Sequence, residues 1–234
     1  MGRPTLLLLH GALGSPATLT PLAERLAADF TVKTLAFAGH GGRPVQPETF
    51  TLPHFAQEVL DFLAAHETGP AHVFGYSMGG YAALLAAARE PGRFASLTAL
   101  GTTVDWAPDL VATAVGFMDP ANIAARFPGF AEQLRQRHTP ADWTAVVTAT
   151  ARLIAAAGAA RFLQAEDFAD LRAPVHLLMG DADQAAGPEA LAALAARLPQ
   201  GRFEVLPHTP HPLERVDLAM LSGRIRSLIF SSNA

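Results

Sequence analysis

The chain has 234 residues, a length that suits one domain carrying an insertion better than two domains. Hydrophobic residues make up 50% of it and charged residues 16%, a composition that excludes an intrinsically disordered chain. The formal net charge of -4 excludes a basic face for nucleic acid or an anionic membrane, and the absence of cysteine excludes disulfides and cysteine-ligated zinc, so we expect a small-molecule ligand.

Short apolar runs alternate with helical patterns along the first hundred residues. The first run ends at Gly11 and is continuous, which is typical of a strand buried on both faces of a sheet. It is too short for a membrane span and lacks a cleavage site, so we expect a cytoplasmic protein. The predicted strands cover residues 5–9, 31–37, 71–76 and 94–100, and the predicted helices cover 19–30, 51–66 and 77–89.

The strand signal stops after Gly101 and returns near residue 175. Between these points the chain is rich in alanine and interrupted by prolines, which indicates short helices. Beyond it we expect strands over 175–179 and 202–206 and helices over 188–198 and 213–230. The sequence therefore predicts a doubly wound, mainly parallel α/β core (residues 1–104 and 170–234) with a helical cap (residues 105–169).

A G-x-S-x-G pattern centred on Ser77 lies between a predicted strand and a predicted helix. In this context the glycines allow a tight turn, and the serine hydroxyl is left exposed at the carboxyl edge of the sheet. A serine hydroxyl is a weak nucleophile at neutral pH, so it needs a general base and a group that orients that base. The pattern therefore predicts a nucleophile whose two partners follow later in the chain.

Candidate partners lie in the loops that follow later strands. Asp183 is the preferred acid, because one more residue of loop lets its carboxylate turn back toward the site, whereas Asp181 is closer to the strand end and suits a loop brace. Asp105 is a third candidate, since it follows the neighbouring strand. For the base we prefer His211, with His208 as its competitor.

Acyl transfer also needs donors for the developing oxyanion, and we expect the backbone N–H groups of Met78 and Ala12 to serve. We expect no metal and no other cofactor. The H-x-x-H spacing of the late histidines resembles a metal motif, but Pro210 and Pro212 break a helical presentation and no further ligands cluster there.

Taken in order, the motifs resemble those of the α/β-hydrolase family. The matching segments are Leu8-Leu9-His10-Gly11, Gly39-His40-Gly41, Gly75-Tyr76-Ser77-Met78-Gly79-Gly80, Gly180-Asp181-Ala182-Asp183 and a late histidine. The resemblance implies an eight-stranded, mostly parallel sheet, a cap inserted after the sixth strand and a Ser/His/Asp triad. One departure is that Glu214 is six residues after His208 and three after His211, whereas an acidic residue commonly follows the family's histidine by about five positions.

Within that family, several reactions share these groups. The leading hypothesis is hydrolysis of small to medium carboxylic esters without a cofactor. The chain also resembles menaquinone-pathway lyases that eliminate pyruvate, but Tyr81 stands where those typically have an arginine that holds substrate carboxylates. A carbon–carbon bond hydrolase, a perhydrolase and a non-catalytic ligand-binding module are the remaining alternatives.

Aromatic side chains are the candidate substrate contacts. Trp106, Phe117 and Trp143 lie in the predicted cap, and Tyr76 directly precedes the serine. The cap aromatics either line an acyl pocket or form the cap's own small core, because an inserted group of helices must bury something.

Overall fold

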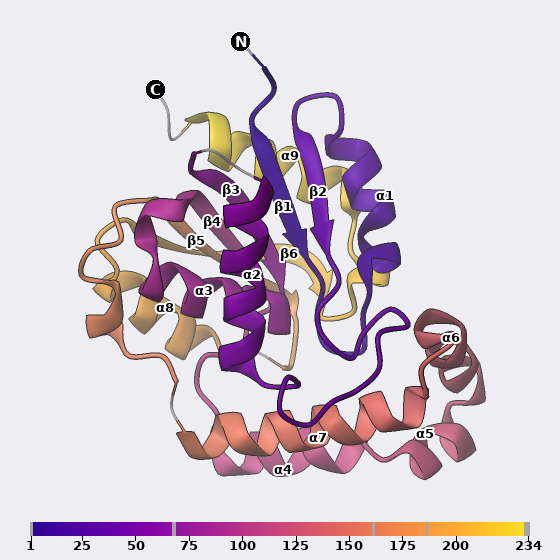
Figure 1. Cartoon of the computed structure of the whole chain (residues 1–234). Helices are drawn as coiled ribbons and strands as arrows, with labels where there is room; N and C mark the ends of the chain where they lie inside the picture. The colour runs from indigo at the N-terminus through magenta and orange to yellow at the C-terminus, as the bar shows by residue number, and fades with distance from the viewer. Residues whose placement is uncertain (1, 67–68, 161, 186, 232–234) are drawn as a thin grey trace.

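Six parallel strands form the central sheet of the computed structural model, which describes residues 2–66, 69–160, 162–185 and 187–231 (Figure 1). Their order across the sheet is β2-β1-β3-β4-β5-β6. The strands are β1 (Thr5–Leu9), β2 (Thr31–Leu35), β3 (Ala71–Tyr76), β4 (Phe94–Leu100), β5 (Val175–Ala182) and β6 (Gly201–Pro210). The apolar run of β1 pairs with β2 on one side and β3 on the other, which explains why residues 6–9 are completely buried.

Helices cover both faces of this sheet. One face carries α2 (Leu52–His66), α3 (Met78–Arg89) and α8 (Pro188–Arg197), and the other carries α1 (Pro16–Leu26) and α9 (Leu218–Ser231). Successive side chains of a strand point to opposite faces, so Leu7 packs in the first core and Leu8 in the second. The predicted doubly wound α/β fold is confirmed.

The strand count implied by the family resemblance is wrong. The described residues contain six strands instead of eight, because the segments between them form helices, short 3-10 turns and loops. The helical insertion consequently follows the fourth strand of this sheet, β4, and not a sixth. Each of the six apolar runs identified residue by residue overlaps one of the six strands.

Some element boundaries also differ from the prediction. Helix α1 begins at Pro16, three residues early, because proline suits the first turn of a helix and Ser15 precedes it as the N-cap. Strand β6 continues to Pro210 because the backbone N–H groups of its last residues bond to a side chain of the β5 end, described below. A 3-10 turn, Leu213–Arg215, precedes α9.

The insertion between β4 and β5 is helical, as predicted. It contains α4 (Pro108–Phe117), α5 (Pro120–Arg126), α6 (Pro128–His138) and α7 (Trp143–Ala160), followed by a 3-10 turn, Ala165–Phe168. Three of these helices begin with proline, whose fixed φ and missing N–H are tolerated in a first turn. Helices α4 and α7 run across the carboxyl ends of the strands (Figure 1).

Helix α7 is, by length and composition, apolar enough to cross a membrane. Its buried residues, which include Val146, Val147 and Leu153, belong to the same core as α2 and α3, and the helix packs along α4. About a third of this apolar stretch, 33%, is buried within the fold.

The start of α3 is pressed against the end of β1, and this contact generates a stability prediction. A β-carbon at Gly79 would lie 2.6 Å from the His10 carbonyl oxygen and 2.7 Å from that of Leu9, so Gly79→Ala requires the backbone to shift. We expect the variant to lose about 1–3 kcal/mol of unfolding free energy, measured by urea denaturation. Gly116→Ala on α4 is the matched control, because a β-carbon there meets no atom within 4 Å. Equal stability of the two variants would contradict this packing.

Candidate active site

The turn between β3 and α3 places Ser77 at the carboxyl edge of the sheet. Its backbone has φ 52° and ψ -116°, a left-handed conformation that costs a non-glycine residue about 1–3 kcal/mol. Four hydrogen bonds hold the backbone of Ser77 in this conformation. The Ser77 N–H donates to the Leu100 carbonyl at 2.8 Å, and the Ser77 carbonyl accepts from the N–H groups of Gly80 and Tyr81 and, at 3.1 Å, from the Thr102 hydroxyl. These bonds fix the backbone of Ser77, and the residue itself is partly exposed.

His211 and Asp183 form a hydrogen-bonded pair at the same edge. The imidazole Nδ1 lies 2.8 Å from Asp183 Oδ2, and the aspartate side chain is 2% exposed. Its other oxygen, Oδ1, accepts the N–H of Ala185 at 2.8 Å, so both oxygens of the buried carboxylate are satisfied. Because an ionised carboxylate only accepts hydrogen bonds, Nδ1 of His211 carries the proton and Nε2 is left as an acceptor.

Gly101 joins the serine turn to this pair. It follows Leu100, the acceptor of the Ser77 N–H, and has φ 62°. A β-carbon at Gly101 would lie 2.9 Å from Asp183 Oδ2 and 3.2 Å from His211 Nδ1. Glycine is thus required for the close approach, and the end of β4 lies between the nucleophile turn and the imidazole.

Tyr76 supports the histidine from the residue before the serine. Its hydroxyl donates to the His211 carbonyl at 2.8 Å, and the two ring centroids are 5.4 Å apart. Burial raises the pKa of Tyr76, so the phenol stays protonated and keeps its donor. Tyr76 is a predicted substrate contact, but its hydroxyl is engaged by the backbone of the histidine loop.

The competing acid and base candidates occupy other positions. The Asp181 carboxylate accepts the backbone N–H of His208 at 2.9 Å and that of Thr209 at 3.1 Å, and these bonds lower the pKa of Asp181. His208 is exposed and has φ 51°. Asp105 is also exposed and lines a cavity described below. The structure therefore brings Asp183 to His211, and places Asp181 as a brace at the end of β6.

The two predicted oxyanion donors lie in the serine turn and in the loop beside it, where a β-carbon at Gly11 would come within 3.2 Å of the Ser77 side chain. Met78 is the first residue of α3, where the first amides have no acceptor within the helix. Ala12 lies in the loop after β1, within a turn closed by the Gly14 N–H on the Gly11 carbonyl at 3.0 Å. The close contact of Gly79 with the end of β1 brings these two segments together.

A cavity of about 610 Å³ lies where the beginning of the cap meets the end of α7 and α8. Its volume is in the range of small-molecule sites. Tyr81, one helical turn after Ser77, lines it together with Trp106 and Leu163. Burial raises the pKa of Tyr81 to about 12, so this side chain carries no charge at neutral pH. The indole N–H of Trp106 is buried beside Tyr81, and the two ring centroids lie 6.3 Å apart.

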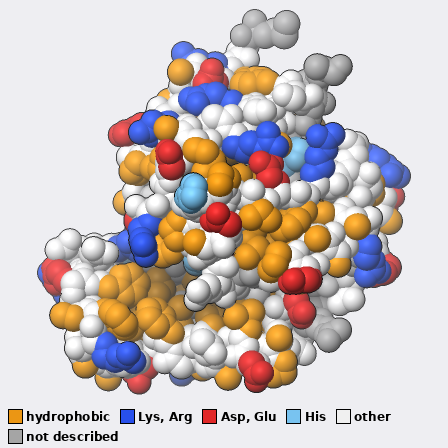
Figure 2. Space-filling model, turned by 180° about the vertical axis from the view of Figure 1, so that it is seen from behind, with side chains coloured by type: hydrophobic (Ala, Val, Ile, Leu, Met, Phe, Trp, Pro, Cys, Tyr) orange, Lys and Arg blue, Asp and Glu red, His pale blue; other side chains and the backbone are white. Residues whose placement is uncertain are grey.

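The other predicted cap contacts lie away from this cavity. Trp143 packs against the main core, and Phe117, 43% exposed, lies beside the exposed Phe127 with ring centroids 5.9 Å apart. Figure 2 shows hydrophobic side chains gathered on the cap next to a hollow between cap and core. Of the three predicted aromatic contacts, Trp106 therefore lines a cavity, whereas Trp143 packs in the core and Phe117 lies in a surface cluster.

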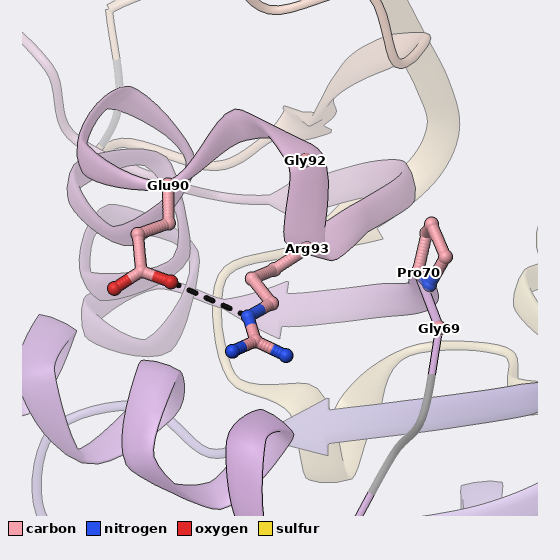
Figure 3. Close-up of a pocket in the computed structure, with 5 residues that line it drawn as sticks. All are labelled: Gly69, Pro70, Glu90, Gly92 and Arg93. Atoms are coloured by element: carbon pink, nitrogen blue, oxygen red, sulfur yellow. Dashed lines mark hydrogen bonds and ion pairs between the residues drawn. The ribbon is translucent and has the colours of Figure 1, made fainter.

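A second pocket, of about 390 Å³, lies at the opposite edge of the sheet, near the amino ends of β3 and β4 (Figure 3). It is lined by Gly69, Pro70, Glu90, Gly92 and Arg93. An ion pair at 3.3 Å joins Arg93 to Glu90. This position separates it from the serine turn. No group of three histidine or carboxylate side chains within the described part of the chain is arranged to hold a metal ion.

Three buried histidines surround the loop that carries Ala12. The ring centroid of His40 lies 5.0 Å from that of His10 and 5.9 Å from that of His138. Burial lowers the pKa of all three, to about 4 for His10. His10 Nδ1 donates to the Gly11 carbonyl at 2.8 Å, and its Nε2 accepts the Phe37 N–H at 3.3 Å, a pattern that only the neutral ring can make.

Sequence reasoning missed the contacts that Gly101, Arg137 and His138 make in the folded chain. Gly101 carries a signal in principle, since a glycine at a strand end beside a triad candidate allows close approach. Arg137 and His138 carry none, because their contacts join segments more than 120 residues apart, as described below.

Comparison with known proteins identifies the family to which the chain is similar. A model described as "Alpha/beta hydrolase family" matches residues 6–219. The pimeloyl-[acyl-carrier protein] methyl ester esterase of Aromatoleum aromaticum is 32% identical over 250 aligned residues, covering 94% of this chain and 97% of that protein. The protein of the same name from Neisseria meningitidis serogroup B is 30% identical, covering 87% of this chain and 84% of its own.

Solved structures agree on the fold. NosK from Streptomyces actuosus superposes with a TM-score of 0.82 at 20% identity and covers all of both chains. An esterase from Thermogutta terrifontis, with malate bound, superposes with a TM-score of 0.74 at 23% identity and covers 99% of this chain and 91% of its own.

The buried His10 generates a pH prediction. In the unfolded chain its pKa is about 6.5, whereas in the folded protein it is about 4, so the folded state binds fewer protons between these values. Its contribution to stability is present above pH 6.5 and is lost as the pH falls toward 4, by about 3 kcal/mol in total. Urea unfolding at pH 7.5, 5.5 and 4.5 measures this decline.

The matched variants are His10→Gln and His66→Gln. The first replaces a completely buried ring and should make the decline between pH 7.5 and 4.5 less steep, whatever its effect on stability at pH 7.5, while the buried His40 and His138 keep their share of it. The second replaces an exposed ring and should keep the wild-type slope. Identical slopes in all three proteins would show that His10 is not the group responsible.

Proposed function

The chain belongs to the alpha/beta hydrolase family and is an esterase of that family, and we propose that Ser77, His211 and Asp183 perform the hydrolysis through an acyl-enzyme intermediate. The observation that carries this assignment is the 2.8 Å bond from His211 Nδ1 to Asp183 Oδ2, made beside Gly101 and the strained Ser77 turn. An imidazole so oriented presents an unprotonated Nε2, which is what a general base needs.

In the proposed reaction, Ser77 Oγ attacks the ester carbonyl carbon while His211 Nε2 takes its proton. The carbonyl oxygen becomes an oxyanion, which accepts from the N–H groups of Ala12 and Met78; each such donor is typically worth about 10²- to 10³-fold in rate. His211 then returns the proton to the departing alkoxide. Water, deprotonated by the same nitrogen, attacks the acyl-enzyme and releases the acid, and the proton goes back to Ser77.

For the substrate we propose a methyl ester at the end of an acyl chain. The relatives at 30–32% identity, which match most of both chains, are named for a methyl ester. The cavity lined by Tyr81, Trp106 and Leu163 begins one helical turn from the nucleophile and has room for the chain.

The site favours this esterase over the pyruvate-eliminating lyase. Tyr81 occupies the position of the arginine that the lyases use, its side chain is buried, and its high pKa keeps it neutral. A multiply anionic substrate would therefore meet no positive charge from this residue. The proposed cap, residues 105–169, supplies Trp106 to the cavity wall.

Removing the nucleophile is the direct test. Ser77→Ala should lower kcat for p-nitrophenyl butyrate by at least about 10⁴-fold, because no other group then forms the acyl-enzyme. Circular dichroism and thermal unfolding check that the variant is folded. Turnover that survives in a folded Ser77→Ala protein would exclude the proposed nucleophile.

Matched pairs test the base and the acid. His211→Ala and Asp183→Asn should each lower kcat by about 10³- to 10⁴-fold, the second because it changes the tautomer that the imidazole adopts. His208→Ala and Asp181→Asn alter the same loops without touching the pair and should stay within about tenfold of the wild type. The reverse ranking within either pair would transfer the role to the competitor.

The cavity assignment predicts a change in chain-length preference. Trp106→Ala enlarges the cavity, so kcat/KM for methyl decanoate relative to methyl butanoate should rise by about fivefold or more, since each buried methylene contributes about 0.8 kcal/mol. Methanol release measures the rates. Arg93→Ala, at the opposite pocket, is the control and should keep the wild-type profile. An unchanged profile in Trp106→Ala would place the acyl chain elsewhere.

A further inference from the structure

The loop that carries Ala12 is held in an unusual conformation. Leu13, the next residue, has φ 57°, in the left-handed region that leucine rarely adopts, and its side chain is buried. A conformation of this kind persists only where its surroundings hold it. The hydrogen bonds on the two sides of Ala12 identify what holds it.

On the first side, the Gly11 carbonyl accepts from His10 Nδ1 at 2.8 Å and from the Gly14 N–H at 3.0 Å. This carbonyl and the N–H of Ala12 belong to the same peptide unit. In a planar trans peptide the two bonds point in opposite directions. Fixing the Gly11 carbonyl therefore aims the Ala12 N–H.

On the second side, the Leu13 carbonyl accepts from two consecutive residues of the cap. Arg137 Nη1 donates to it at 2.8 Å and His138 Nε2 at 3.2 Å, both from the last turn of α6. His138 is completely buried, and its Nδ1 accepts the Gly41 N–H at 3.3 Å, so the neutral ring is satisfied at both nitrogens. The second guanidinium nitrogen of Arg137 lies 3.2 Å from Glu214, three residues after His211.

We propose that Arg137 and His138 are positioning residues for the reaction, which keep the Ala12 N–H aimed at the oxyanion by holding the Leu13 carbonyl. The inference rests on the proposed esterase function and extends it to the cap. It makes the cap part of the catalytic geometry, because the same helix end contacts the oxyanion loop and, through Glu214, the segment after the base. Arg137 and His138 touch neither the serine nor the reacting atoms.

The test separates transition-state stabilisation from folding. Arg137→Met and His138→Leu should lower kcat by about 10- to 100-fold, less than the complete loss of an oxyanion donor, with KM within about threefold. A long-chain alkyl trifluoromethyl ketone forms a tetrahedral adduct with a reactive serine and so places an oxyanion in the same position. Its inhibition constant should rise by the same factor as kcat falls, a correlation that a merely structural role would not produce.

Two further variants sharpen the comparison. Arg135→Met removes an arginine from the same helix that is exposed and pairs with Glu132, so it should leave kcat and the inhibition constant unchanged. His138→Gln retains an amide donor near the position of Nε2 and should recover most of the lost kcat. Arg137 is only partly buried, so Arg137→Met provides the test even where His138→Leu does not fold.

Wild type and Ser77→Ala are measured in the same series. Absence of serine-dependent turnover in the wild type would overturn the proposed function, and this inference with it. Serine-dependent turnover together with an unchanged kcat and inhibition constant in folded Arg137→Met would overturn this inference alone. Parallel changes in kcat and inhibition constant, with recovery in His138→Gln, are the expected result.

Discussion

All six strands run in one direction, and this constraint determines where every reactive group lies. Each strand of a parallel sheet ends at the same edge, so the loops after β1, β3, β4, β5 and β6 meet there although they are far apart in the chain. These loops carry Ala12, Ser77, Gly101, Asp183 and His211, respectively. At this edge the carboxylate of Asp183 is buried, and the packing is so close that position 101 requires glycine. The proposed chemistry depends on this convergence more than on any single contact.

The sequence predicted correctly those elements whose residue pattern arises from short-range structure. Apolar runs and glycine breaks located all six strands, and the turn around Ser77 followed from small residues at fixed spacing. The number eight came from the resemblance and was wrong, because the described residues form a sheet of six strands. The end of β6 was placed early because its last bonds go to the side chain of Asp181 on another strand, and such pairing leaves no periodic signal.

The candidate site shows the same division. Asp183 follows Asp181 by two positions in the loop, and the structure gives the two carboxylates different hydrogen-bond partners, an imidazole and a pair of backbone amides. The roles of Tyr76 and the cap aromatics were less accessible. A tyrosine beside the serine suggests a substrate contact, but the Tyr76 hydroxyl donates to the carbonyl of His211, 135 residues later. Only the folded structure shows that these two residues are in contact.

The hydrogen bonds between the end of α6 and the Leu13 carbonyl also bear on how such proteins diversify. Caps of this kind are natural candidates for exchange between relatives, because they enter and leave the core at two neighbouring strand ends. Here a transplanted cap would need to bring two donors to one carbonyl of the recipient, in addition to a pocket of the right shape. Exchange of the cap is thus limited by the hydrogen bonds of Arg137 and His138 to the Leu13 carbonyl of the core. A chimera that lacks them could bind the new substrate well but turn it over slowly.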